Sequence, residues 1–225
     1  MKGCEWSSYS PPVDCSWTWK KITHIMKKFQ QAYTNNQWLN SPTEYTVKAG
    51  YSWLCGNQPK VRWRFLCWNT LNIPKSSFIC WGIMHQRLLT KDRLLRMGII
   101  VDGGCEICAA ANEDHKHIFS DCQYTRQCLS LFQLKMQVPM DLTDMITWFS
   151  KCRGITKFQK RFVGACYVDL LYSIWLVRND ARINGLVKSP RFVIQKVIED
   201  VLHRFQRLNT SNLQSRERAW LQQIS

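Results

Sequence analysis

Four residues with metal-binding side chains lie close together in the sequence, in the pattern C-x2-C-x8-H-x4-C. They are Cys105, Cys108, His117 and Cys122. Zinc binds thiolate sulfur and imidazole nitrogen tetrahedrally, at about 2.3 Å and about 2.0–2.1 Å. A C-x2-C pair reaches one ion through a tight turn, and the loop after it is long enough to return. Because the protein fills all four positions, the pattern predicts one structural Zn²⁺ rather than a catalytic zinc with an open position.

His115 competes with His117 for the fourth ligand position. In a regular helix His115 and Cys122 would share a face, but they would stand about 10 Å apart along the axis. His117 is nearer, although a regular helix would rotate it by about 140° from Cys122. His117 therefore works if it precedes the regular helix. We favour His117 and keep His115 as the alternative ligand.

Two other interpretations of these cysteines stay open. A C-x2-C pair can be redox-active, but that use expects a strand before the pair and a helix directly after it. Here Gly103 and Gly104 come first and a polar loop follows. The chain contains 11 cysteines, so a chance cluster is the more serious alternative. Four ligands at workable spacing favour zinc over both.

The charge balance favours a polyanionic partner. Thirty-one Lys and Arg face 16 Asp and Glu, which gives a net charge of +15. The surplus is +6 up to Cys122 and +9 after it. Such a surplus attracts nucleic acid first and anionic membranes second. Because the charge is dispersed, a merely solubilising surface is an equal alternative.

The sequence also predicts where the protein resides. The first residues lack the apolar segment of a signal peptide, and the number of cysteines is odd. We therefore expect reduced thiols in an intracellular protein, nuclear or cytoplasmic and not secreted. The longest apolar stretch, residues 162–177, is shorter than the about 20 residues of a membrane span and contains Asp169. We expect a buried helix there and no membrane partner.

Hydrophobic periodicity predicts a mainly α fold, a helical domain with a small CCHC zinc knuckle followed by a C-terminal helical pair. The predicted regions are 1–40, with an irregular segment and a basic helix; 41–137, the zinc-binding domain; and 138–225, the C-terminal helices. The expected helices span about 17–33, 47–54, 74–88, 91–97, 118–137, 142–148, 158–184 and 190–208.

Arginine and tryptophan alternate in residues 61–71. Trp63 and Trp68 are candidates for stacking on bases. At helical spacing, a core tryptophan flanked by arginines that reach the solvent is the commoner arrangement. The candidate nucleic-acid-binding residues are Arg62, Arg64, Lys75, Arg87, Lys91 and Arg93.

A longer ordered pattern contains the knuckle: P-K…F…W…H-x-R-L-x-T-x-D-R-L…G…C-x-x-C…E…H-x-F…C, from Pro74 to Cys122. It resembles the reverse transcriptase zinc-binding domain of plant LINE-type, non-LTR retrotransposons. The resemblance covers about residues 45–131, and residues 174–179 resemble a segment that often follows the knuckle. It implies a retroelement-derived protein that holds zinc through the four residues of the knuckle. It also implies binding to RNA or DNA, which we expect to occur without strict sequence choice.

The catalytic parts of such an element are not in this chain. It has no Tyr-x-Asp-Asp polymerase signature and no acidic set of the RNase H type. His85 with Asp92, or Asp141 with Asp144, lacks a nucleophile, an oxyanion donor or a metal at suitable spacing. We therefore expect no enzyme. The alternatives to nucleic-acid binding are a zinc-stabilised structural or protein-interaction module and a non-functional retroelement remnant.

Overall fold

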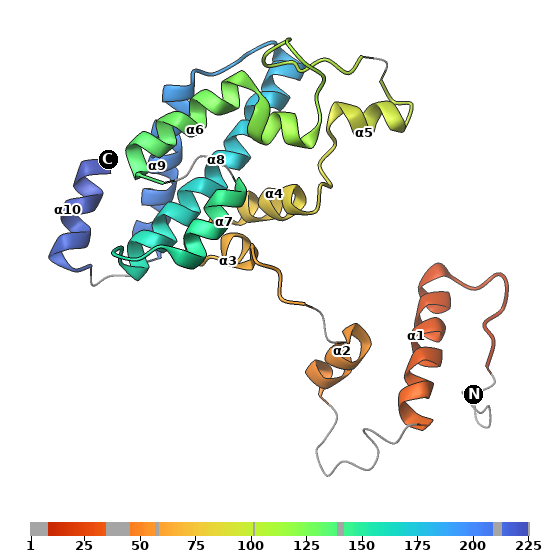
Figure 1. The fold of residues 1–225 in the computed structure, drawn as a ribbon. Coiled ribbons are helices and arrows are strands. Elements are labelled where there is room, and N and C mark those ends of the chain that lie inside the picture. The colour runs from red at the N-terminus through yellow and green to blue at the C-terminus, as the bar shows by residue number, and fades with distance from the viewer. Residues whose placement is uncertain are drawn as a thin grey trace. The chain divides into compact units, whose positions relative to one another are not determined.

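The computed structural model describes residues 9–34, 46–56, 59–100, 102–138, 142–208 and 213–224. The chain divides into two compact units, residues 1–59 and 60–225. Within the described ranges the fold is mainly helical, as predicted, and contains no β-strand (Figure 1). The one exception to helix and loop there is an isolated antiparallel bridge between Gly104 and Asn112.

The first unit contributes α1 (Trp17–Thr34) and α2 (Val47–Cys55). The α1 helix confirms the predicted basic helix to within one residue at its end. Ser16 begins it, because its hydroxyl accepts a hydrogen bond from the backbone N–H of Trp19 at 3.2 Å. Of the irregular segment predicted before this helix, residues 1–8 lie outside the described residues, as do residues 35–45 after it.

The second unit is built around one long helix. The α8 helix packs against α3, α4, α9 and the turn η1, while α6 packs against α9. In Figure 1, α8 runs through the middle of this unit. The described elements of the unit are α3 (Arg64–Cys67), α4 (Pro74–Met84), α5 (Lys91–Arg96), η1 (His117–Asp121), α6 (Gln123–Met136), α7 (Leu142–Lys151), α8 (Lys157–Asn184), α9 (Pro190–Arg207) and α10 (Ser215–Ile224).

Local signals fix both ends of α8. Thr156 and Gln159 form a capping box, in which each side chain accepts a hydrogen bond from the other residue's backbone N–H. Gly185 ends the helix in the left-handed conformation, with φ +65°, which glycine adopts without a steric penalty. Residues 162–171 between these ends are all buried, which confirms the predicted buried helix. Among the described helices, none combines the length and the apolar character that crossing a bilayer would require.

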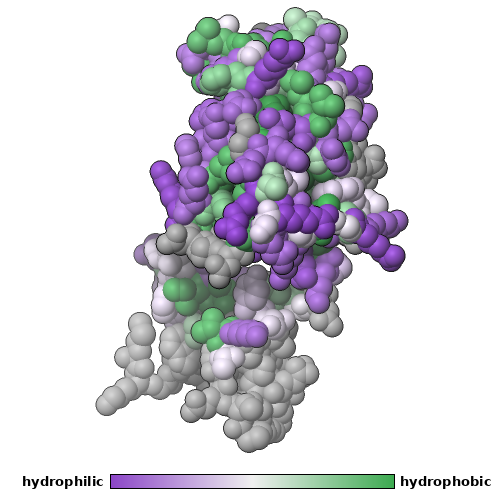
Figure 2. All heavy atoms as spheres, turned by 90° about the vertical axis from the view of Figure 1, so that its left-hand side faces the viewer, coloured by the Kyte–Doolittle hydropathy of each residue, from purple (hydrophilic) through white to green (hydrophobic). Residues whose placement is uncertain are grey.

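One carboxyl group lies inside this core. Asp169 is 3% exposed and accepts a hydrogen bond from the Ser76 hydroxyl at 2.6 Å, which ties α8 to α4. Burial raises the pKa of Asp169 to about 6, although the hydrogen bond from Ser76 opposes the rise. Outside the core, hydrophilic side chains predominate on the face of this unit drawn in Figure 2, with smaller apolar areas between them.

Two expectations about helices need correction. The helix predicted over 118–137 is interrupted at Cys122, whose ψ of 132° is extended rather than helical. The reason is that the extended backbone of this cysteine directs its side chain towards the Cys/His group described below. The sequence also predicted two C-terminal helices, whereas α10 follows α9 as a further one. The helices of the predicted regions 41–137 and 138–225 pack together, since α4 and α6 contact α8 and α9.

Candidate metal centre

The four residues of the C-x2-C-x8-H-x4-C pattern converge in space. The sulfur atoms of Cys105, Cys108 and Cys122 and a ring nitrogen of His117 all lie within 4.8 Å of one another. The Cys108 sulfur lies 3.3 Å from Nε2 of His117. Cys105 and Cys122 are buried, while Cys108 and His117 are half-buried. Three thiols and one imidazole that meet in this way can hold one metal ion, and the donor set fits zinc.

A tight turn presents the first two cysteines. The backbone N–H of Cys105 donates to the carbonyl of Ala111 at 2.9 Å, and the carbonyl of Cys105 accepts from Ala109 at 2.9 Å. Ala109 has a φ of +52°, which a residue with a side chain rarely adopts. The loop therefore turns back directly after Cys108, and its returning segment brings the chain towards His117.

A single π-helical turn places His117 beside Cys122. The two residues are five apart, and the backbone N–H of Cys122 donates to the carbonyl of His117 at 2.7 Å. In an α-helix such a pair would diverge, whereas the i to i+5 bond of a π-turn sets them one above the other. Asp114 begins this turn by accepting a hydrogen bond from the N–H of His117 at 2.6 Å. His117 thus precedes the regular helix, as expected, and it lies in the π-helical turn before α6.

His115 lies outside the group of converging ligand atoms. Its ring contacts Phe119, with centroids 5.6 Å apart, and its Nε2 is buried without a hydrogen-bond partner. Burial lowers the pKa of His115. The geometry therefore favours His117 over the alternative, and the identity of the metal-binding histidine stays a prediction.

The two buried thiols of the group interact with each other. The pKa of Cys105 is raised to about 12, because its thiol donates to Cys122 and because burial disfavours the thiolate. The pKa of Cys122 is lowered, since its sulfur accepts this hydrogen bond. Metal binding requires thiolates, so an ion at this position would displace the protons of these thiols.

A buried ion pair attaches the loop of the knuckle to α8. Glu113, which lies between the two halves of the Cys/His pattern, is 1% exposed and pairs with Arg178, which is 3% exposed. The Arg178 Nε donates to both carboxylate oxygens at 3.0 Å. Glu113 also accepts from the backbone N–H of Lys91 at 2.8 Å, at the start of α5. One carboxylate therefore joins the knuckle, α5 and α8.

Both members of this pair lie in segments that resemble the family, but the sequence does not predict that they form an ion pair. Glu113 is the E of the ordered pattern, and Arg178 lies in the segment at 174–179 that resembles the family. Their separation of 65 residues hides the contact, because no local spacing predicts it. Arg178 also lies over the ring of Trp175, 4.9 Å from its centroid.

The candidate nucleic-acid-binding residues occupy different environments. Arg62, Arg64 and Arg87 are exposed. Lys75 is exposed beside the Tyr172 ring, at 5.3 Å, on the edge of a cavity of about 460 Å³ between α4, α8 and α9. Arg93 is half-buried and donates to the carbonyl of Gln86.

Lys91 does not fit the role of a phosphate contact. Its side chain is 4% exposed and its ammonium group pairs with Asp102 at 2.8 Å and Glu106 at 2.7 Å. Although burial alone would lower it, the pKa of Lys91 is raised, because both carboxylates accept hydrogen bonds from it. Lys91 therefore holds the loop of Cys105 against α5, and its charge is neutralised within the protein.

His85 and Asp92, one of the two acid–base pairs considered from the sequence, each have other partners. Asp92 pairs with Arg96 at 2.8 Å and accepts a hydrogen bond from the Thr90 hydroxyl. His85 contacts aromatic rings instead. Asp141 lies outside the described residues.

Comparison with known families identifies the type of domain that contains this site. Residues 45–128 match the family described as zinc-binding in reverse transcriptase. The match includes all four residues of the Cys/His group and confirms the domain type predicted for this segment. No curated protein and no solved structure matches the chain.

Proposed function

We propose that this chain is a retroelement-derived zinc-binding protein that binds RNA or DNA through a basic surface, without strict sequence choice and without catalysis of its own. The observation that carries the proposal is the convergence of Cys105, Cys108, His117 and Cys122 inside a segment that matches a reverse transcriptase zinc-binding family. The ordered pattern of residues around the knuckle supports an origin in a LINE-type element of plants.

The zinc in this proposal is structural. All four ligands come from the protein, which is typical of sites that stabilise a fold and leave no position for a substrate. Apparent zinc free energies of about 10–16 kcal/mol are known for small zinc-binding peptides. An energy of this size is enough to decide whether the loop of the knuckle folds. Metal-binding thiols of this kind suit a reducing compartment, the nucleus or the cytoplasm.

The charge distribution supports a nucleic-acid partner. Residues 60–90 contain five basic residues and no acidic one. Arg62, Arg64 and Arg87 are exposed, and none of them takes part in an ion pair in the described part of the chain. Exposed cations that no carboxylate neutralises are available to phosphate groups.

The salt dependence of binding tests this proposal. We would titrate zinc-loaded protein into a fluorescent oligonucleotide at several salt concentrations. Each phosphate contact releases counterions, so affinity should fall steeply as salt rises, and Arg62→Gln or Arg87→Gln should each make the slope shallower by about 0.7–0.9. The matched control is Arg182→Gln, an exposed arginine at the end of α8. Absence of binding at low salt would reject the proposal and leave a structural or protein-interaction module, or a remnant without function.

A further inference from the structure

Five rings on α4 and at the ends of α3 and α4 form a continuous series of contacts, which we call the aromatic ladder. Trp68 stacks on Trp63, with centroids 6.0 Å apart and planes 18° apart. The Trp63 ring meets His85 edge to face at 5.3 Å, and His85 contacts Trp81 at 4.8 Å. Trp81 in turn stacks on Phe78, at 6.1 Å and 26°. The ladder therefore runs without a gap from the end of α3 to the outer side of α4.

The two ends of the ladder face solvent. Phe78 is 68% exposed and Trp68 is 66% exposed, while the inner rings Trp63 and Trp81 also pack against the core. Core packing explains the inner rings. It does not explain the two end rings, which are about two-thirds exposed. Large exposed aromatic side chains that form one patch mark a contact site more often than isolated exposed side chains do.

On α4, Phe78 lies on the side of the helix that is opposite the face formed by Ser76, Cys80 and Ile83. The buried residues of α4 are Ser76, Cys80, Gly82 and Ile83, of which all but Gly82 share one face. Phe78 and Trp81 lie on the opposite face, at about 140–200° from Ser76 at 3.6 residues per turn. A surface helix normally presents polar residues on that side. Phe78, which lies on that side and is 68% exposed, departs from this pattern.

Charge indicates which partner fits the ladder. Arg62 and Arg64 flank Trp63 in the sequence, and Arg87 follows His85 by two residues. No acidic residue occurs between positions 60 and 90. Flat rings beside unneutralised arginines match a polyanion that also offers flat rings, which is a nucleic acid with accessible bases. In a duplex the bases are already stacked inside the helix, so the ladder selects a single strand.

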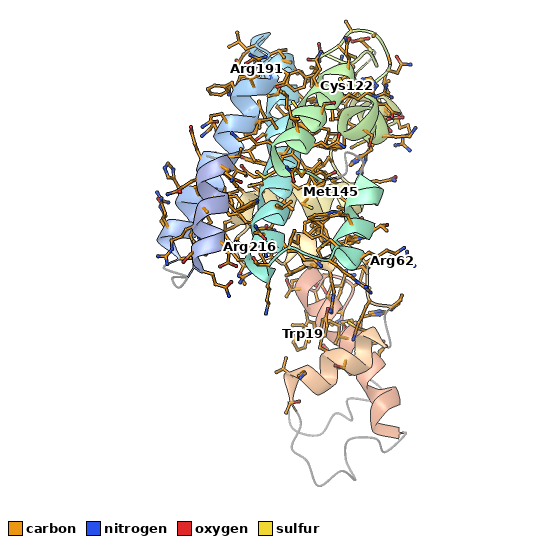
Figure 3. All side chains as sticks on the ribbon, turned by 60° about the vertical axis from the view of Figure 1, so that its left-hand side comes forward. Trp19, Arg62, Cys122, Met145, Arg191 and Arg216 are labelled. Atoms are coloured by element: carbon orange, nitrogen blue, oxygen red, sulfur yellow. The ribbon has the colours of Figure 1, made fainter. Side chains whose placement is uncertain are left out.

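We propose that the aromatic ladder stacks the bases of single-stranded RNA or DNA, while Arg62, Arg64 and Arg87 contact the phosphates. This inference rests on the proposed nucleic-acid binding and names its site and its strand preference. Stacking acts at the exposed ends, Phe78 and Trp68, because neighbouring rings already contact each other along the ladder. The metal centre lies apart from this surface: Figure 3 shows Cys122 and Arg62 towards different ends of the 60–225 unit.

The test compares strands and variants in one binding assay. Fluorescence anisotropy would measure binding of zinc-loaded protein to single strands of uridine or deoxythymidine of about 12 nucleotides, within the span of known single-strand sites. A DNA duplex of the same length is the comparison. Phe78→Ala and Trp68→Ala should each weaken single-strand binding by about 5- to 150-fold, the effect of losing one stacked base. Both side chains are exposed, so the fold should survive these changes.

Two matched variants separate stacking from general effects. Phe192→Ala removes a 52% exposed ring from α9 and should leave binding unchanged. Trp68→Phe keeps a ring and should retain most of the affinity that Trp68→Ala loses. Equal binding of single strand and duplex, with no effect of Phe78→Ala or Trp68→Ala, would overturn the inference but leave the proposed electrostatic binding in place. No binding of any nucleic acid at low salt would overturn both.

Discussion

Removal of Arg178 is the sharpest test of how the knuckle is held. The Arg178→Met variant keeps a side chain of similar length but leaves the carboxylate of Glu113 buried without its cation. Loss of one partner from a buried ion pair costs about 3–5 kcal/mol, because the remaining charge is uncompensated. Both partners are at most 3% exposed at the side chain, so little solvent screening reduces this cost. The expected loss of unfolding free energy is therefore about 3–5 kcal/mol.

Urea unfolding of the zinc-loaded protein, followed by far-ultraviolet circular dichroism, measures this loss. Arg182→Met is the matched control, since Arg182 lies one turn further along α8 and is exposed. It should change stability by no more than about 0.5 kcal/mol. The double variant Arg178→Met with Glu113→Gln should lose less than the sum of the two single changes, because the double variant leaves no buried charge without a partner. A loss below about 1 kcal/mol for Arg178→Met would refute the reasoning.

Three further predictions follow from the fold. Asp169 binds its proton more tightly in the folded state, so stability should fall by up to about 3 kcal/mol as pH rises from about 4 to about 6. Asp169→Asn should remove this fall. If the stability difference between the wild-type protein and Asp169→Asn is the same at pH 4.5 and at pH 7, the prediction is wrong. Lys91→Met should change nucleic-acid affinity less than about 2-fold in the anisotropy assay, since its charge is neutralised internally, and a loss as large as that of Arg87→Gln would return Lys91 to the binding surface. Chelation of zinc should speed amide hydrogen exchange in residues 103–125 far more than in the middle of α8, and uniform acceleration would argue against a local structural role.

Much of the helical fold is predictable from local signals in the sequence. Thr156 and Gly185 bound α8 within one residue of its expected ends, because capping and left-handed glycine act locally. The interruption at Cys122 is not predictable in this way. Helical periodicity continues through it, and only the demands of the Cys/His group turn this residue out of the helix.

The candidate site shows the same division. The four converging residues follow from their spacing, since every ligand lies within one short segment. The burial of Lys91 and its pairing with Asp102 and Glu106 depend on how α5 packs against the loop, which composition does not reveal. The outward position of Phe78 was equally hidden, because spacing defines a stripe on a helix without saying which side faces the core.

Zinc content is the measurement that tests the central claim most directly. The protein would be purified without added metal, and its zinc determined by mass spectrometry alongside single variants. The account predicts one zinc per chain, lost when Cys105, Cys108, His117 or Cys122 is replaced and kept in His115→Ala. A protein that folds without zinc, or a zinc that survives His117→Ala and disappears with His115→Ala, would contradict it.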